Sequence, residues 1–337
     1  MHTSSSAAAW RAPWLIIGWL IVACPLTLKA EQWQAYPSDL PTFNFDGDRL
    51  KQQWDLLQRG TVQQYPSSDW VATQLAHPGL CKATLKSLVA HDDVGGASAE
   101  YQEDCSAIDN GQVAALLQQA WRDFFTGEFQ KAVQAGEALG AIGYPVAGYA
   151  RIAYGQMLAR SSEEKTKVLE QAIKYADAYQ KIAPGSAYSL FVSANAMGRI
   201  MEDLSLSAAL ITGYNSDARQ RLEALIQAYP KHARGAATYG GYNGGVIGKS
   251  GQFVARISYS ATPEKMESGF TTAMRTEPPL ISAHLEYAIA LERVYGDKQR
   301  EKARRTLENI VTLTPLEAEE ALAQERAKAM LAALDSP

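Results

Sequence analysis

A recurring distance between alanine and proline constrains the fold of this chain more than any other feature. Three times an alanine stands twelve residues before a proline: Ala172 and Pro184, Ala218 and Pro230, and Ala303 and Pro315. A small side chain on the second helix of a hairpin lets the first helix approach closely, and proline ends a helix because it lacks the backbone N–H. The repeated spacing therefore predicts helical hairpins stacked along the chain.

Two further segments follow a related pattern. One contains Gly127, Phe129, Ala132 and Pro145, and the other contains Phe270, Ala273 and Pro278. The five prolines that end these units are 39, 46, 48 and 37 residues apart. After about Asn110, apolar residues recur at helical spacing and no alternating strand pattern persists. We expect an all-α fold with helices over 112–126, 128–141, 144–160, 163–182, 185–211, 215–229, 231–258, 262–276, 279–294, 298–313 and 316–334.

These residues carry a resemblance to a known family. The Gly127, Phe129 and Ala132 pattern and the alanine–proline pairs resemble degenerate tetratricopeptide repeats (TPR) over about residues 112–334. The resemblance implies a right-handed α-solenoid of about five irregular TPR-like helical hairpins, whose groove binds protein segments. The chain departs from the family because its units exceed the usual ~34 residues and because no unit has the full Trp, Leu-Gly, Tyr set.

The layout of the chain is also similar to the T component of tripartite ATP-independent periplasmic (TRAP) transporters. This narrower resemblance implies a small organic ligand, a solute-binding protein as partner, and trimers. The balance of 32 basic and 36 acidic residues, a formal net charge of −4, provides no basic surface for nucleic acid. We therefore expect protein or small-molecule partners.

The first thirty residues have the features of a secretory signal peptide. They contain Arg11, an apolar run over Trp14–Cys24 and a small residue, Ala30, at the expected cleavage position. The run is shorter than the ~20 apolar residues that span a bilayer. In one interpretation cleavage after Ala30 releases a soluble periplasmic protein. In the other, Cys24 ends a lipobox and is lipidated, which anchors the protein to a membrane.

Two cysteines remain after the signal region, Cys81 and Cys105, 24 residues apart. In an oxidising compartment this pair predicts a disulfide that staples an irregular N-terminal extension over residues 31–110. Closing this loop would stabilise the fold by roughly 3 kcal/mol in the chain-entropy model. The alternative is two buried, unpaired thiols. We also expect Trp33, Trp54 and Trp70 to pack the extension against the first repeats.

The sequence contains no recognisable catalytic motif. Its five histidines are isolated, no metal-ligand spacing or nucleophile motif occurs, and we expect no catalytic residue, metal or cofactor. The segment Asn243–Ser250 resembles a phosphate-binding loop, but Asn243 replaces its first glycine and no predicted strand precedes it. We therefore do not expect nucleotide binding.

A glycine-rich helical segment is the main candidate for binding. Gly241, Gly245 and Gly248 fall on one helical face, and each glycine costs a helix ~1 kcal/mol relative to alanine. Either a neighbouring helix packs closely there, or a ligand or partner peptide lies against that face. On the helix from 185, Asn195 and Arg199 could present a fork to a carboxylate, although an ordinary surface arginine is the alternative. The candidate binding residues are Tyr188, Asn195, Arg199, Tyr239, Tyr242, Asn243, Gly245, Gly248 and Lys249.

The sequence thus predicts an exported protein of three parts: a signal peptide over 1–30, the extension over 31–110 and a TPR-like helical domain over 111–337. Its expected role is non-enzymatic, as a periplasmic scaffold whose helical-repeat groove binds an envelope protein. The alternative role is that of a TRAP-associated, T-component-like protein that binds a small organic ligand and a solute-binding protein.

Overall fold

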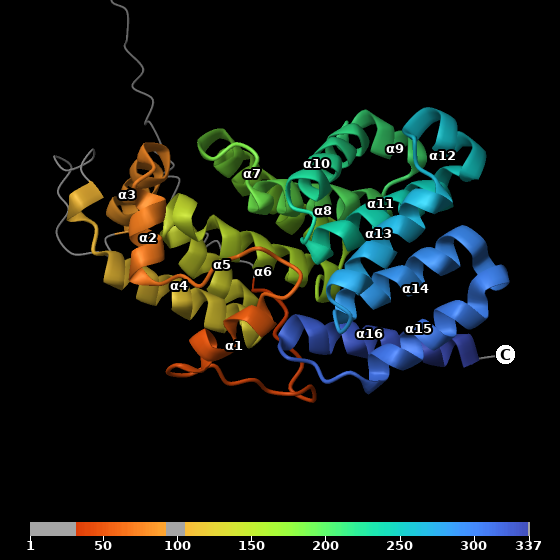
Figure 1. Ribbon diagram of the computed structural model, residues 1–337, viewed down its shortest axis with the longest axis horizontal. Coiled ribbons are helices and arrows are strands. Elements are labelled where there is room, and N and C mark those ends of the chain that lie inside the picture. The colour runs from red at the N-terminus through yellow and green to blue at the C-terminus, as the bar shows by residue number, and fades with distance from the viewer. Residues whose placement is uncertain (1–31, 92–104, 336–337) are drawn as a thin grey trace, which may run out of the picture. The chain divides into compact units, whose positions relative to one another are not determined.

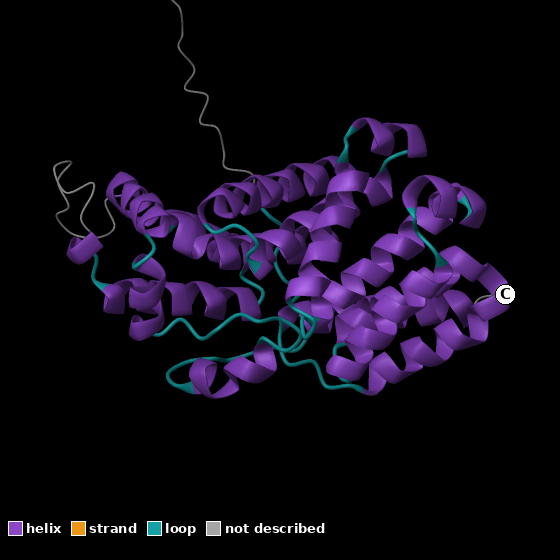
Figure 2. Ribbon diagram, turned by 45° about the horizontal axis from the view of Figure 1, so that its top comes forward, coloured by secondary structure: helices purple, strands orange, loops and turns teal. Residues whose placement is uncertain are grey.

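Helices form all the regular secondary structure of residues 32–91 and 105–335, which are the residues described by the computed structural model (Figure 2). The all-α prediction is confirmed for these residues. The expected signal peptide and Cys24 lie outside them. Within the same two ranges, no helix is long and apolar enough to cross a membrane.

The N-terminal half contains short helices followed by longer ones (Figure 1). In chain order the elements are α1 (Arg49–Leu57), α2 (Ser68–Leu75), α3 (Pro78–His91), the 3₁₀ turn η2 (Cys105–Ala107), α4 (Asn110–Phe125), α5 (Phe129–Ala138), the 3₁₀ turn η3 (Gly140–Gly143), α6 (Tyr144–Met157), α7 (Ser162–Ile182) and α8 (Ala187–Asp203). The C-terminal half contains α9 (Leu206–Ile211), α10 (Tyr214–Ala228), α11 (Ala233–Ser250), α12 (Gln252–Tyr259), α13 (Pro263–Thr276), α14 (Ile281–Tyr295), the 3₁₀ turn η4 (Gly296–Gln299), α15 (Arg300–Thr312) and α16 (Ala318–Asp335).

The long helices pack in antiparallel neighbours along the chain. Contacting pairs include α4 with α5, α6 with α7, α8 with α10, α11 with α13 and α14 with α15. The first helices of successive pairs also contact one another, from α4 through α6, α8, α11 and α14 to α16. The alanines of the repeating pattern are fully buried within this packing: Ala132, Ala172, Ala218, Ala273 and Ala303. Their small side chains therefore lie where helices meet, as the spacing predicts.

Two of the expected long helices are each broken in two. The segment predicted as 185–211 divides into α8 and α9, because Leu204 adopts an extended backbone and the Ser205 hydroxyl accepts a hydrogen bond from the Ala208 N–H. The segment predicted as 231–258 divides into α11 and α12 at Gly251, whose φ of +78° ends the first helix. Both breaks follow from ordinary capping chemistry.

Aromatic side chains near the N-terminal end of the described chain pack on the longer helices α4 and α6. Trp33 stacks on Tyr154 of α6 with ring centroids 4.0 Å apart, and Trp54 meets Trp121 of α4 edge-on at 5.5 Å. Trp70 is half-buried beside the apolar cluster that joins α2, α3 and α4. The described residues from Trp33 onward accordingly form one compact unit.

Candidate functional site

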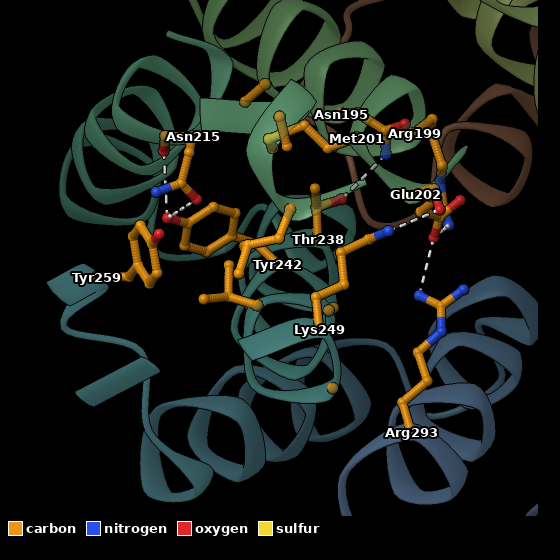
Figure 3. A pocket seen from close by; sticks show the side chains of 18 of the residues that line it. Asn195, Arg199, Met201, Glu202, Asn215, Thr238, Tyr242, Lys249, Tyr259 and Arg293 are labelled. Atoms are coloured by element: carbon orange, nitrogen blue, oxygen red, sulfur yellow. Dashed lines mark hydrogen bonds and ion pairs between the residues drawn. The ribbon is translucent and has the colours of Figure 1, made fainter. Parts of the chain in front are cut away.

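A cavity of about 340 Å³ lies among α8, α9, α10, α11, α12 and α14 (Figure 3). Helix α8 contributes one wall and α11 the facing wall, while Leu206 and Leu210 of α9 and Tyr259 of α12 border it from the outside. Met201 and Val246 add further apolar surface. The cavity therefore combines apolar walls with a small number of polar groups, as ligand pockets do.

The helices that border the cavity from outside occupy the two longest units of the sequence. Helix α9 falls in the interval of 46 residues between Pro184 and Pro230, and α12 in the interval of 48 between Pro230 and Pro278. The additional length that distinguishes these units from the shorter ones therefore contains the outer helices of the cavity.

Glycines keep the cavity open on the facing sides of α8 and α11. A Cβ atom at Gly198 or Gly245 would meet no atom within 4 Å, and one at Gly241 would meet only the Glu286 carboxylate at 3.9 Å. All three glycines line the cavity. Any larger side chain at these positions would extend into that space.

A second face of α11 carries glycines for a different reason. A Cβ atom at Gly240 would lie 2.8 Å from the Phe270 ring of α13, and one at Gly244 would lie 3.0 Å from Ala290 of α14. Gly248, which also lines the cavity, is close to Arg293. Close helix packing, one of the two alternatives considered for the glycine-rich segment, therefore applies to this face, whereas Gly241 and Gly245 border the cavity.

One end of the cavity contains a network of ion pairs. Arg199 contacts Glu286 at 2.8 Å and Glu202 at 3.0 Å, and Arg293 also contacts Glu202 at 3.0 Å. Burial disfavours the charge of Glu202, but Arg199, Arg293 and Lys165 outweigh burial and lower its pKa to about 2. The fork of Arg199 therefore holds carboxylates of its own chain.

Two further predicted binding residues, Lys249 and Asn195, also make hydrogen bonds within the protein. The Lys249 ammonium donates to the backbone carbonyls of Glu202 at 3.0 Å and Leu204 at 2.7 Å, and so caps the C-terminal end of α8 (Figure 3). The Asn195 amide donates to the Thr238 hydroxyl at 3.2 Å, and that hydroxyl donates to the Arg234 carbonyl. The buried Oδ1 of Asn195 has no hydrogen-bond partner among the described residues.

Six of the nine predicted binding residues line the cavity: Asn195, Arg199, Tyr242, Gly245, Gly248 and Lys249. The other three are buried among helices. Tyr188 packs edge-on against Tyr179 with centroids 5.1 Å apart, and the Asn243 amide donates to the Tyr239 carbonyl at 2.8 Å. The cavity is also lined by residues that the sequence pattern does not indicate, which include Met201, Glu202, Leu206, Leu210, Val246 and Glu286. The two long intervals between prolines were the signal that could have located the α9 residues.

The described residues contain no group of three or more His, Cys, Asp or Glu side chains that could hold a metal ion. The chain matches no protein-family model, and a search of curated proteins finds no match. The geometry of the cavity is therefore the main guide to function.

Proposed function

We propose that this protein is a non-catalytic binding protein that holds a small organic molecule in the cavity between α8 and α11. The observation that carries this proposal is the cavity itself, whose volume of about 340 Å³ falls in the range of small-molecule sites. Gly198, Gly241 and Gly245 leave its interior open, at a cost in helix stability that a packing role does not account for.

The charged groups of the cavity favour binding over catalysis. Arg199 forms ion pairs with both Glu202 and Glu286, so these charged side chains are already paired within the protein. A general acid or base works best with a pKa near the operating pH, whereas the pKa of Glu202 is about 2.

The wider architecture in this proposal is a right-handed α-solenoid of about five TPR-like hairpins. Contacts between the first helices of successive pairs, together with the buried alanines, support it. The T-component resemblance then suggests a periplasmic role in which the ligand passes to a solute-binding protein. A scaffold that binds an extended protein segment has less support, because the cavity is sized for a small molecule.

Native mass spectrometry of the protein purified from its own cell envelope tests this function. We expect a bound organic molecule on the wild-type protein and none on Gly245→Phe, because the ring would fill the cavity. Ala115→Leu, an exposed position on α4, is the matched control and should keep the ligand. Absence of any bound molecule, together with no thermal shift from an extract of the envelope, would contradict the proposal.

A Cys81–Cys105 disulfide is part of the same proposal. The two Cα atoms are 5.9 Å apart, which is within the range that a disulfide requires. We expect no free thiol when the exported protein is denatured without reductant, and a loss of roughly 3 kcal/mol of stability on reduction. Titration of two free thiols would support the unpaired alternative instead.

A further inference from the structure

The helices α9 and α12 expose large apolar side chains that no other described segment covers. The exposed fractions are 87% for Ile211, 77% for Phe253 and 67% for Ile257. We call this surface the apolar rim and define it as Leu206, Leu210, Ile211, Phe253, Val254 and Ile257. Figure 1 shows α9 and α12 at the same edge of the helical unit.

The clustering of these side chains is the unusual feature. Six of the nine exposed large hydrophobic residues in the described part of the chain belong to the apolar rim, and the other three are Leu56, Val62 and Leu116. Scattered exposed apolar residues are normal on protein surfaces, whereas contiguous apolar patches mark sites of interaction. Of the residues of α12, only Ala255, near its middle, is buried, so the helix presents most of its surface outward.

The charge of the surrounding segments indicates what the rim meets. Helix α9 contains no charged side chain, and the single charged side chain of α12 is Arg256, which is exposed between Phe253 and Ile257 in the sequence. Exposed apolar side chains next to basic ones are typical of surfaces that bind anionic membranes.

We propose that the apolar rim docks on a lipid bilayer that carries anionic head groups. Phe253, Ile257 and Ile211 enter the boundary between head groups and acyl chains, while Arg256 contacts lipid phosphates. Two short helices with outward apolar side chains suit a bilayer better than a partner helix, which requires a groove. Leu206 and Leu210 belong both to the rim and to the cavity wall, so docking places that side of the cavity next to the membrane.

Vesicle flotation tests this proposal with the chain from Glu31 onward. A lipid anchor on Cys24 would itself bind vesicles, and the described residues from Trp33 onward form one compact unit without it. We expect flotation with vesicles of phosphatidylcholine and phosphatidylglycerol, and weaker flotation with phosphatidylcholine alone. The double variant Phe253→Ser, Ile257→Ser should lower the bound fraction about tenfold, and Arg256→Gln should lower it about fivefold.

Leu56→Ser, an exposed leucine on α1, is the matched control and should float like the wild type. Because all of these side chains are exposed, thermal melting should stay unchanged in every variant. Flotation that is absent, or that the double variant does not reduce, overturns the proposal. So does a dimer that forms without lipid and dissociates in the double variant, because a second copy of the chain would then occupy the rim.

Discussion

Neighbouring glycines of α11 have opposite environments. Gly244 faces Ala290 and Met266 at close range, whereas Gly245 faces open space in the cavity. The sequence could show that this helix contains too many glycines for its own stability. It could not show which glycine meets a helix and which meets a cavity, because the neighbours come from segments 20 to 50 residues away in the chain. The same limit applies to Arg199, whose partner Glu286 is 87 residues distant.

Leucine substitutions at these two glycines should separate binding from folding. Gly245→Leu should keep or raise the melting temperature, because glycine is a poor helix former, yet abolish ligand binding by filling the cavity. Gly244→Leu should destabilise the fold by about 1–3 kcal/mol, because the side chain has no room. Chemical denaturation and ligand titration of both variants measure these effects. Equal destabilisation by the two variants would contradict the assignment of faces.

At the scale of elements, helix positions follow the sequence pattern closely, but two breaks were missed. The apolar pattern continues through Leu204–Ser205 and through Gly251, so periodicity alone indicates unbroken helices. The local capping residues were readable, since Ser205 can cap a helix and Gly251 can end one. The sequence could not show that the segments after the two breaks form α9 and α12 beside the same cavity.

The start of α11 provides a prediction about pH. The buried ring of His232 accepts a hydrogen bond from the Gly235 N–H at 2.9 Å, and burial, assisted by Arg234, lowers its pKa to about 4. The unfolded chain, with a pKa near 6.5, then binds the proton more readily. Stability is therefore complete above pH 6.5 and falls as the pH drops towards 4, by roughly 3 kcal/mol in total.

Urea denaturation at a series of pH values between 7.5 and 5 measures this loss. His232→Asn keeps a side chain that can cap the helix but cannot titrate, so its stability should depend less on pH over the same interval. A wild-type curve and a variant curve with the same slope would show that His232 does not titrate in this way.

At the scale of the whole molecule, contacts between distant segments hold the two ends of the described chain together. Arg59, which follows α1, forms a buried ion pair with Glu320 of α16, and the Arg234 N–H donates to the Gly60 carbonyl at 2.9 Å. Proline spacing predicted the series of helical pairs that the contacts between helices support. Nothing in the sequence predicted that α16 would contact α4 and α6, because this contact depends on how the whole series curves.

Removal of Glu320 should weaken this long-range connection. Glu320→Gln leaves the buried guanidinium of Arg59 without a carboxylate partner, and we expect a loss of about 3 kcal/mol in the free energy of unfolding. Glu325→Gln on the same helix removes an exposed ion pair with Lys328 and should cost less than ~1 kcal/mol. Denaturant titration compares the two variants. Equal losses in the free energy of unfolding would show that the Arg59–Glu320 pair stabilises the protein no more than an exposed ion pair does.

The placement of α9 and α12 has a consequence for how such a protein can diversify. Each of these short helices lies between two longer helices, and the framework of packed helices continues on both sides. Exchange or lengthening of these two segments would alter the shape of the cavity and its outer surface while the buried alanine crossings stay intact. Selectivity and core stability can therefore change independently, and variants in which the sequences of α9 and α12 are replaced should fold while binding different ligands.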